Sequence, residues 1–159
     1  MNWFDDVPMS KVYNRLFISG YVQASHLGAN NPMGITAVLN VSTDAAWERP
    51  TDYEEAPDVV YAHIPFEDGE EIPEAAFWAC MKFLHDRYLH GDNVLIHCAA
   101  GISRSVTICT SFMHFAHIMQ FADALEYIKT RRPVANPHIE ILNSARKLLR
   151  VWPYDGSMD

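Results

Sequence analysis

The chain has 159 residues, of which 49% are apolar and 20% are charged. This composition suits a single domain over residues 1–159 that buries its own core, and it argues against intrinsic disorder. The net charge of −8 argues against nucleic acid as the main partner, because binding a phosphate backbone needs a basic surface.

Short apolar runs predict four β-strands. In chain order they cover residues 11–19, 35–42, 59–64 and 93–97. Continuous apolar runs of this length are typical of strands that helices bury on both faces of a sheet.

Helical patterns lie between and after these runs, over residues 73–89, 104–119, 121–131 and 137–150. The first is expected to begin with Pro73, and the last to follow Asn136 as its cap with Pro137 in the first turn. Alternating strands and helices predict an α/β fold, with a central, mostly parallel sheet of four to five strands flanked by helices. Ligands of such folds bind at the carboxyl ends of the strands.

Residues 97–105, HCAAGISRS, lie at such an end, between a predicted strand and a predicted helix. Small residues and Gly101 allow the backbone to curl with its N–H groups inward, and the helix N-terminus adds further N–H groups. Arg104, six positions after Cys98, supplies a planar fork for two phosphoryl oxygens. The same positive surroundings stabilise a cysteine thiolate and make Cys98 a candidate nucleophile. The predicted phosphate-binding residues are Ala99, Ala100, Gly101, Ile102, Ser103 and Arg104.

The other two cysteines, Cys80 and Cys109, lie in apolar helical patterns and are expected to be packing residues. Three cysteines without a CxxC motif predict neither a disulfide framework nor a zinc site. No apolar run reaches the ~18 residues that a membrane span needs, and no signal-peptide pattern follows Met1. We therefore expect a cytoplasmic protein without stable membrane anchoring.

The segment HCAAGISRS matches the signature HCxxGxxR[ST] and resembles the dual-specificity branch of the cysteine-based protein tyrosine phosphatases. The stretches RLFISG, GITAVLNVS, IPFED and RRPVANPH are compatible with the same catalytic domain. The resemblance implies a phosphatase-like fold and a phosphocysteine mechanism without metal or cofactor, acting on phosphotyrosine, phosphoserine and phosphothreonine in proteins. It also implies that Cys98 attacks phosphorus, Arg104 holds the equatorial oxygens, Ser105 helps the thiolate to leave, and His97 braces the loop.

Hydrolysis also needs a carboxylic acid that protonates the leaving group. The segment IPFEDGEEIP offers four carboxylates, namely Glu67, Asp68, Glu70 and Glu71. Their spacing does not choose among them. The resemblance implies Asp68, because IPFED matches the strand-end segment that carries the family's aspartate.

Two features bear on the substrate. The variable loop residues are neutral and lack the lysines of the lipid phosphatases in the resembled branch, which favours phosphoproteins over the alternative of a lipid or inositol phosphate. A predicted helix ends with three cations, Lys129, Arg131 and Arg132, which we expect to interact with the negative end of its dipole. The alternative hypothesis is that Arg132 faces the pocket mouth and holds a second anionic group.

Two other classes of protein would also use an anion-binding loop: a rhodanese-like sulfurtransferase and a phosphate-binding module without activity. The arginine six residues after the cysteine, together with a separate acid, favours phosphate over sulfur transfer. Binding alone needs no nucleophile, which disfavours the second class.

Overall fold

The computed structural model describes residues 2–43 and 54–151. Its five-stranded sheet has the order β1-β2-β5-β3-β4. The strands are β1 (Ser10–Tyr13), β2 (Leu16–Ser19), β3 (Ala37–Asn40), β4 (Val60–His63) and β5 (Val94–His97). β1 runs antiparallel to β2 and every other pairing is parallel, which confirms the predicted sheet.

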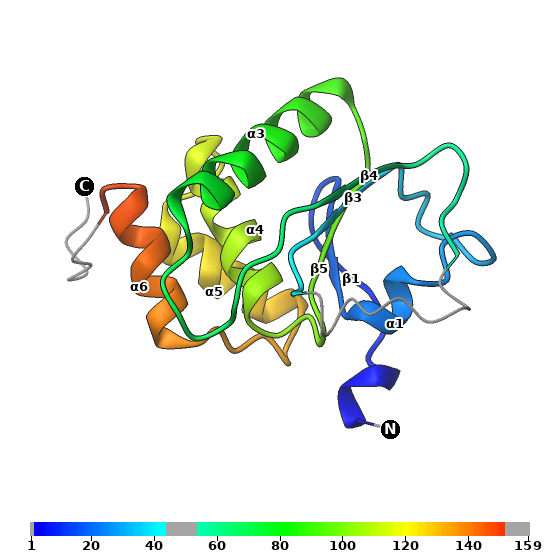
Figure 1. Cartoon of the computed structure of the whole chain (residues 1–159), viewed down its shortest axis with the longest axis horizontal. Coiled ribbons are helices and arrows are strands. Elements are labelled where there is room, and N and C mark those ends of the chain that lie inside the picture. Colours follow the sequence, from blue (N-terminus) through cyan, green and yellow to red (C-terminus); the bar gives the residue numbers. More distant parts are fainter. Residues whose placement is uncertain (1, 44–53, 152–159) are drawn as a thin grey trace.

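Helices cover both faces of this sheet. They are η1 (Trp3–Asp6), α1 (Tyr21–Ala24), α3 (Glu74–His90), α4 (Arg104–Phe115), α5 (Phe121–Arg131) and α6 (Ile139–Leu148). Figure 1 shows α3, α4, α5 and α6 on one side of the sheet and α1 on the other. Within the described ranges, no helix combines the length and apolar character of a membrane span.

The core consists of two apolar clusters, one on each face of the sheet. In the central strand β5, Val94 and Ile96 point into the larger cluster, which the four long helices complete, whereas Leu95 points into the smaller one beside α1. This alternation is the period of two that a β-strand imposes on its side chains. β5 is therefore buried on both faces, and its carboxyl end lies at the centre of the sheet.

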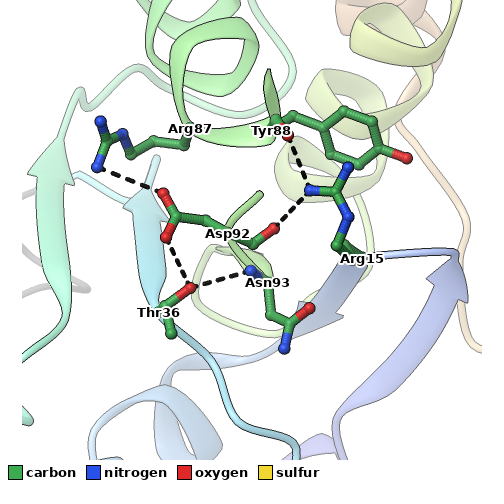
Figure 2. Close-up of polar contacts among 6 residues, drawn as sticks. All are labelled: Arg15, Thr36, Arg87, Tyr88, Asp92 and Asn93. Atoms are coloured by element: carbon green, nitrogen blue, oxygen red, sulfur yellow. Dashed lines mark hydrogen bonds and ion pairs between the residues drawn. The ribbon is translucent and has the colours of Figure 1, made fainter. Parts of the chain in front are cut away.

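A polar network fixes the opposite end of β5 (Figure 2). Asp92 accepts a hydrogen bond of 2.8 Å from the Thr36 hydroxyl and pairs with Arg87 at 3.3 Å. Arg15 donates to the carbonyls of Tyr88 at 2.8 Å and Asp92 at 3.0 Å, with its guanidinium 4.1 Å from the Tyr88 ring centroid. These contacts connect the start of β5 to three other segments: the end of α3, the start of β3 and the turn before β2.

The prediction of one strand over residues 11–19 is wrong, because this segment forms β1 and β2 with a reversal between them. Tyr13 pairs with Leu16, so the chain turns at Asn14 and Arg15. The Arg15 side chain leaves the sheet for the carbonyls at the end of α3, which explains a charged residue within an apolar run.

The prediction for residues 59–64 is correct as a strand and wrong as a strand buried on both faces. β4 lies at the edge of the sheet, and Val60 is 43% exposed. An apolar β-branched run therefore does not distinguish an edge strand from a central one here.

The helix predicted over residues 104–119 ends earlier, at Phe115. His117 adopts a left-handed conformation with φ of 60°, and the Ile118 N–H reaches back to the Met113 carbonyl at 2.8 Å. These contacts satisfy carbonyls of the last turn, as C-terminal caps do.

The last helix begins at Ile139, two residues after Pro137, so the prediction of Asn136 as its cap is wrong. His138 is the cap residue, and its Nδ1 atom accepts a hydrogen bond from the Glu140 N–H at 3.3 Å. The Asn136 N–H instead bonds the Ile102 carbonyl at 2.9 Å.

Candidate active site

The loop between β5 and α4 holds the candidate nucleophile. β5 ends at His97, α4 begins at Arg104, and Cys98 is the first residue between them. The segment thus lies where the sequence predicted it, at the carboxyl end of the central strand. We call residues 98–103 the phosphate loop.

Four carbonyl groups of the phosphate loop, those of residues 99–102, face away from its centre and bind other parts of the chain. The Tyr21 N–H donates to Ala99 O and the Asn136 N–H to Ile102 O, each at 2.9 Å. Arg132 donates from Nη2 to Ala100 O at 3.3 Å and from Nε to Gly101 O at 2.7 Å.

Because C=O and N–H point in opposite directions across a trans peptide, these contacts turn the N–H groups of residues 100–103 inward. The Gly101 N–H does point inward, donating to the Cys98 sulfur at 3.3 Å. The loop therefore forms a concave surface of N–H groups, an arrangement that binds anions.

Gly101 is the residue that permits this curvature. Its φ of +72° is left-handed, and a Cβ atom there would lie 2.6 Å from the carbonyl carbon of Ser19 and 2.5 Å from Arg132 Nη2. Both the conformation and the close approach of β2 exclude a side chain.

Cys98 is 2% exposed and lies below this concave surface. Its sulfur lies 3.2 Å from the hydroxyl of Ser105, which is completely buried in the first turn of α4. The structure therefore brings Cys98 and Ser105, two of the predicted site residues, together.

Arg104 lines the same pocket and is half-buried at the start of α4. Its Nη1 atom donates to the Phe66 carbonyl at 3.2 Å, which ties the phosphate loop to the segment that follows β4. That segment carries the four carboxylates from which spacing alone did not choose.

Asp68 is the carboxylate that meets the pocket of Cys98. Its Oδ1 atom accepts hydrogen bonds from the Ser103 hydroxyl at 2.7 Å and from the Gly69 N–H at 3.0 Å. The pocket has a volume of about 410 Å³, and its lining includes Asp68, Cys98 and Arg104. The glutamates Glu67, Glu70 and Glu71 line a separate hollow nearby.

His97 is completely buried behind the phosphate loop. Its Nδ1 atom lies 3.3 Å from the Cys98 carbonyl, and burial lowers the pKa of its imidazole to about 4. A neutral ring in this place contacts the loop from behind and has no access to the pocket.

The prediction that Arg132 faces the pocket mouth is wrong. The residue is 1% exposed, and in addition to the two loop carbonyls its guanidinium bonds Pro8 O at 3.0 Å and Ser10 Oγ at 2.9 Å. Burial lowers the pKa of Arg132, and the nearby Cys98 acts in the opposite direction. The physical reason for the error is that the chain around residue 132 turns under the phosphate loop, where unpaired carbonyls need a donor.

The sequence did not indicate the role of the Ser103 side chain. Its hydroxyl connects Asp68 with the backbone N–H of His138, which lies 2.9 Å away. Ser103 and Asp68 are 35 residues apart, so no local pattern signals this contact.

Comparison with known proteins shows the family of the chain. Residues 16–148 match the family model described as the dual specificity phosphatase catalytic domain. The chain belongs to the dual specificity phosphatase family. Dual specificity protein phosphatase 15 of Homo sapiens is 35% identical over 124 residues, which are 77% of this chain and 40% of the human protein. Dual specificity protein phosphatase 1 of Arabidopsis thaliana is 30% identical over 145 residues, 91% of this chain and 70% of the plant protein.

Solved structures of dual specificity phosphatases share the fold. The crystal structure of DUSP15 superposes with a TM-score of 0.71 at 32% identity, covering 94% of this chain and 89% of that one. The crystal structure of human DUSP28 gives a TM-score of 0.73 at 26% identity, covering 91% and 94%. The chain spans 40% of the length of human dual specificity protein phosphatase 15.

Proposed function

We propose that this chain hydrolyses phosphomonoesters of tyrosine, serine and threonine in proteins through a phosphocysteine intermediate. The observation that carries the proposal is the contact of the Gly101 N–H with the Cys98 sulfur, with Asp68 and Arg104 on the same pocket. A module that only binds phosphate needs neither a nucleophile nor an acid. The cytoplasm is the compartment we propose, because a reducing environment keeps the thiol of Cys98 available.

In the first step, the thiolate of Cys98 attacks phosphorus, so that an S–P bond forms while the P–O bond to the leaving group breaks. The inward N–H groups and the guanidinium of Arg104 bind the non-bridging oxygens, on which charge develops. Asp68 transfers its proton to the leaving oxygen, which departs as an alcohol or phenol.

In the second step, Asp68, now a carboxylate, accepts a proton from water as the water oxygen attacks phosphorus. The new O–P bond replaces the S–P bond, and inorganic phosphate leaves. Ser105, whose hydroxyl lies 3.2 Å from the Cys98 sulfur, donates to the departing thiolate. The cycle consumes one water and restores both Cys98 and the protonated Asp68.

The lining of the pocket supports a phosphoprotein substrate over an inositol phosphate or phosphoinositide. Of the described residues that line it, Arg104 alone carries a permanent positive charge. A single phosphoryl group matches this charge, whereas a multiply phosphorylated headgroup would leave further anionic groups without a cationic partner.

The test is hydrolysis of p-nitrophenyl phosphate and a phosphotyrosine peptide, in the presence of a chelator, by the wild type and three variants. We expect no turnover from Cys98→Ser, and losses on the order of 100-fold or more from Arg104→Lys and, on the peptide, from Asp68→Asn. Turnover by Cys98→Ser would overturn the mechanism. Higher kcat/KM on phosphoinositides than on phosphopeptides would favour the alternative substrate.

A further inference from the structure

Ser103 is the last residue of the phosphate loop, and its side chain points away from the loop. The residue is 8% exposed, and its hydroxyl contacts two segments distant in sequence, Asp68 Oδ1 at 2.7 Å and the His138 N–H at 2.9 Å. We propose that Ser103 is a positioning residue that determines which carboxyl oxygen of Asp68 carries the catalytic proton. This inference rests on the proposed role of Asp68 as general acid.

The direction of the two hydrogen bonds follows from their chemistry. A backbone N–H only donates, so the Ser103 oxygen accepts from His138. A hydroxyl has one hydrogen, and the bond to Asp68 uses it, so Asp68 Oδ1 is an acceptor.

The same oxygen of Asp68 receives a second donor, the Gly69 N–H at 3.0 Å. A carboxyl oxygen that bears the proton is a poor acceptor, so two donors on Oδ1 place the proton of the neutral acid on Oδ2. Ser103 thereby leaves Oδ2 as the oxygen that transfers the proton to the leaving group.

The contact also couples the acid to the substrate. The backbone of Ser103 belongs to the surface that would hold the phosphoryl group, while its side chain holds the acid. A carboxyl group that sits on an exposed segment is thus kept in a fixed relation to the bond that breaks. Correct placement of a catalytic group contributes a large part of an enzyme's rate enhancement, and displacing the group by about 1 Å can slow the reaction up to about 100-fold.

A purely structural role makes a different prediction. If Ser103 only supported the loop or α6, its removal would slow all substrates by the same factor. If it positions the acid, removal slows substrates in proportion to their need for protonation. Leaving groups of low pKa, such as p-nitrophenol, need little protonation, whereas phenol and the tyrosine of a peptide need it strongly.

The experiment measures kcat/KM, which reports the first step, on a series of aryl phosphates from p-nitrophenyl to phenyl phosphate and on one phosphotyrosine peptide. For Ser103→Ala we expect a loss of about 10- to 30-fold on phenyl phosphate and the peptide, and under about threefold on p-nitrophenyl phosphate. Ser103→Thr, which keeps the hydroxyl, should restore the wild-type pattern.

Ser144→Ala is the matched control. Ser144 is also 8% exposed, and its hydroxyl accepts a hydrogen bond of 2.8 Å from the N–H of Ile72, which lies four residues after Asp68. Its removal loosens the same segment without touching the Asp68 carboxyl. We expect equal effects on all leaving groups for this variant.

The double variant of Ser103→Ala and Asp68→Asn should be no slower than Asp68→Asn alone, because the positioned proton is already absent. Equal losses by Ser103→Ala across the series, or additive losses in the double variant, would overturn the inference. Should Ser103→Ala fail to unfold cooperatively, Ser103→Cys, with its weak S–H donor, answers the same question. If Asp68→Asn itself shows no dependence on the leaving group, the proposed role of the acid fails instead.

Discussion

Replacing Arg132 by alanine should destabilise the protein strongly, although the residue lies outside the pocket. The change removes the donors to the carbonyls of Ala100 and Gly101, to Pro8 O and to the Ser10 hydroxyl. A buried acceptor left without a partner costs about 1–3 kcal/mol, and release of the buried guanidinium to water offsets part of the sum. We expect a loss of about 3–5 kcal/mol in the free energy of unfolding.

Urea unfolding followed by tryptophan fluorescence measures this loss, and the neighbouring Arg131→Ala is the control. Arg131 is exposed and contacts the Tyr127 side chain, with its guanidinium 2.9 Å from the hydroxyl, so its removal should cost less than about 1 kcal/mol. Relative to the wild type, Arg132→Ala should lose activity by the same factor on singly and on doubly phosphorylated peptides. An Arg132→Ala protein as stable as Arg131→Ala, or one impaired only on doubly phosphorylated peptides, would refute this reasoning.

Acid should destabilise the fold by about 3 kcal/mol as the pH falls from about 6.5 to 4, because burial lowers the pKa of His97 to about 4 and the unfolded chain binds the proton first. In urea unfolding, the His97→Asn variant should not show this acid-dependent loss of stability. If its free energy of unfolding depends on pH as that of the wild type does, His97 is not the cause. Of the three cysteines, iodoacetamide at pH 8 should label Cys98 alone, because burial raises the pKa of Cys80 and Cys109 to about 12. Mass spectrometry of the folded protein locates the label, and label on Cys80 or Cys109 would contradict this expectation. Asp92→Ala should lower the free energy of unfolding by about 1–2 kcal/mol. Its kcat should stay close to that of the wild type, because the polar network of Asp92 lies at the end of β5 far from the pocket. A lower kcat at unchanged stability would contradict this prediction.

The place of Cys98 and the course of its loop could be predicted from the sequence because the relevant residues are contiguous. Cys98 and Gly101 lie between a strand and a helix, and Arg104 is the first residue of that helix, so spacing and local backbone preference determine their arrangement. The sheet could be predicted for a similar reason, since each strand carries its own apolar run.

The remaining features depend on contacts between segments far apart in sequence. Four carboxylates near residue 68 are equivalent by spacing, so the residues by themselves did not choose among them. The family resemblance implied Asp68, and the fold places Asp68 on the pocket of Cys98 and the three glutamates on a separate hollow. Arg132 closes a helix, where local reasoning predicts an exposed cation, but packing turns it under the phosphate loop. Asn136 was predicted to cap the last helix because it precedes Pro137. In the structure its N–H binds a carbonyl of the phosphate loop, and His138 caps α6.

The outward carbonyls of the phosphate loop have a consequence for how the chain must fold. Their partners come from Tyr21, Arg132 and Asn136, and Arg132 in turn reaches Pro8 across 124 residues. A fragment with β5, the loop and α4 would hold the nucleophile and Arg104 without the contacts that turn the N–H groups inward. Since contacts of such long range form only after large loops have closed, we expect the anion-binding shape to be completed late, when the segments around Pro8, Tyr21 and Arg132 have docked.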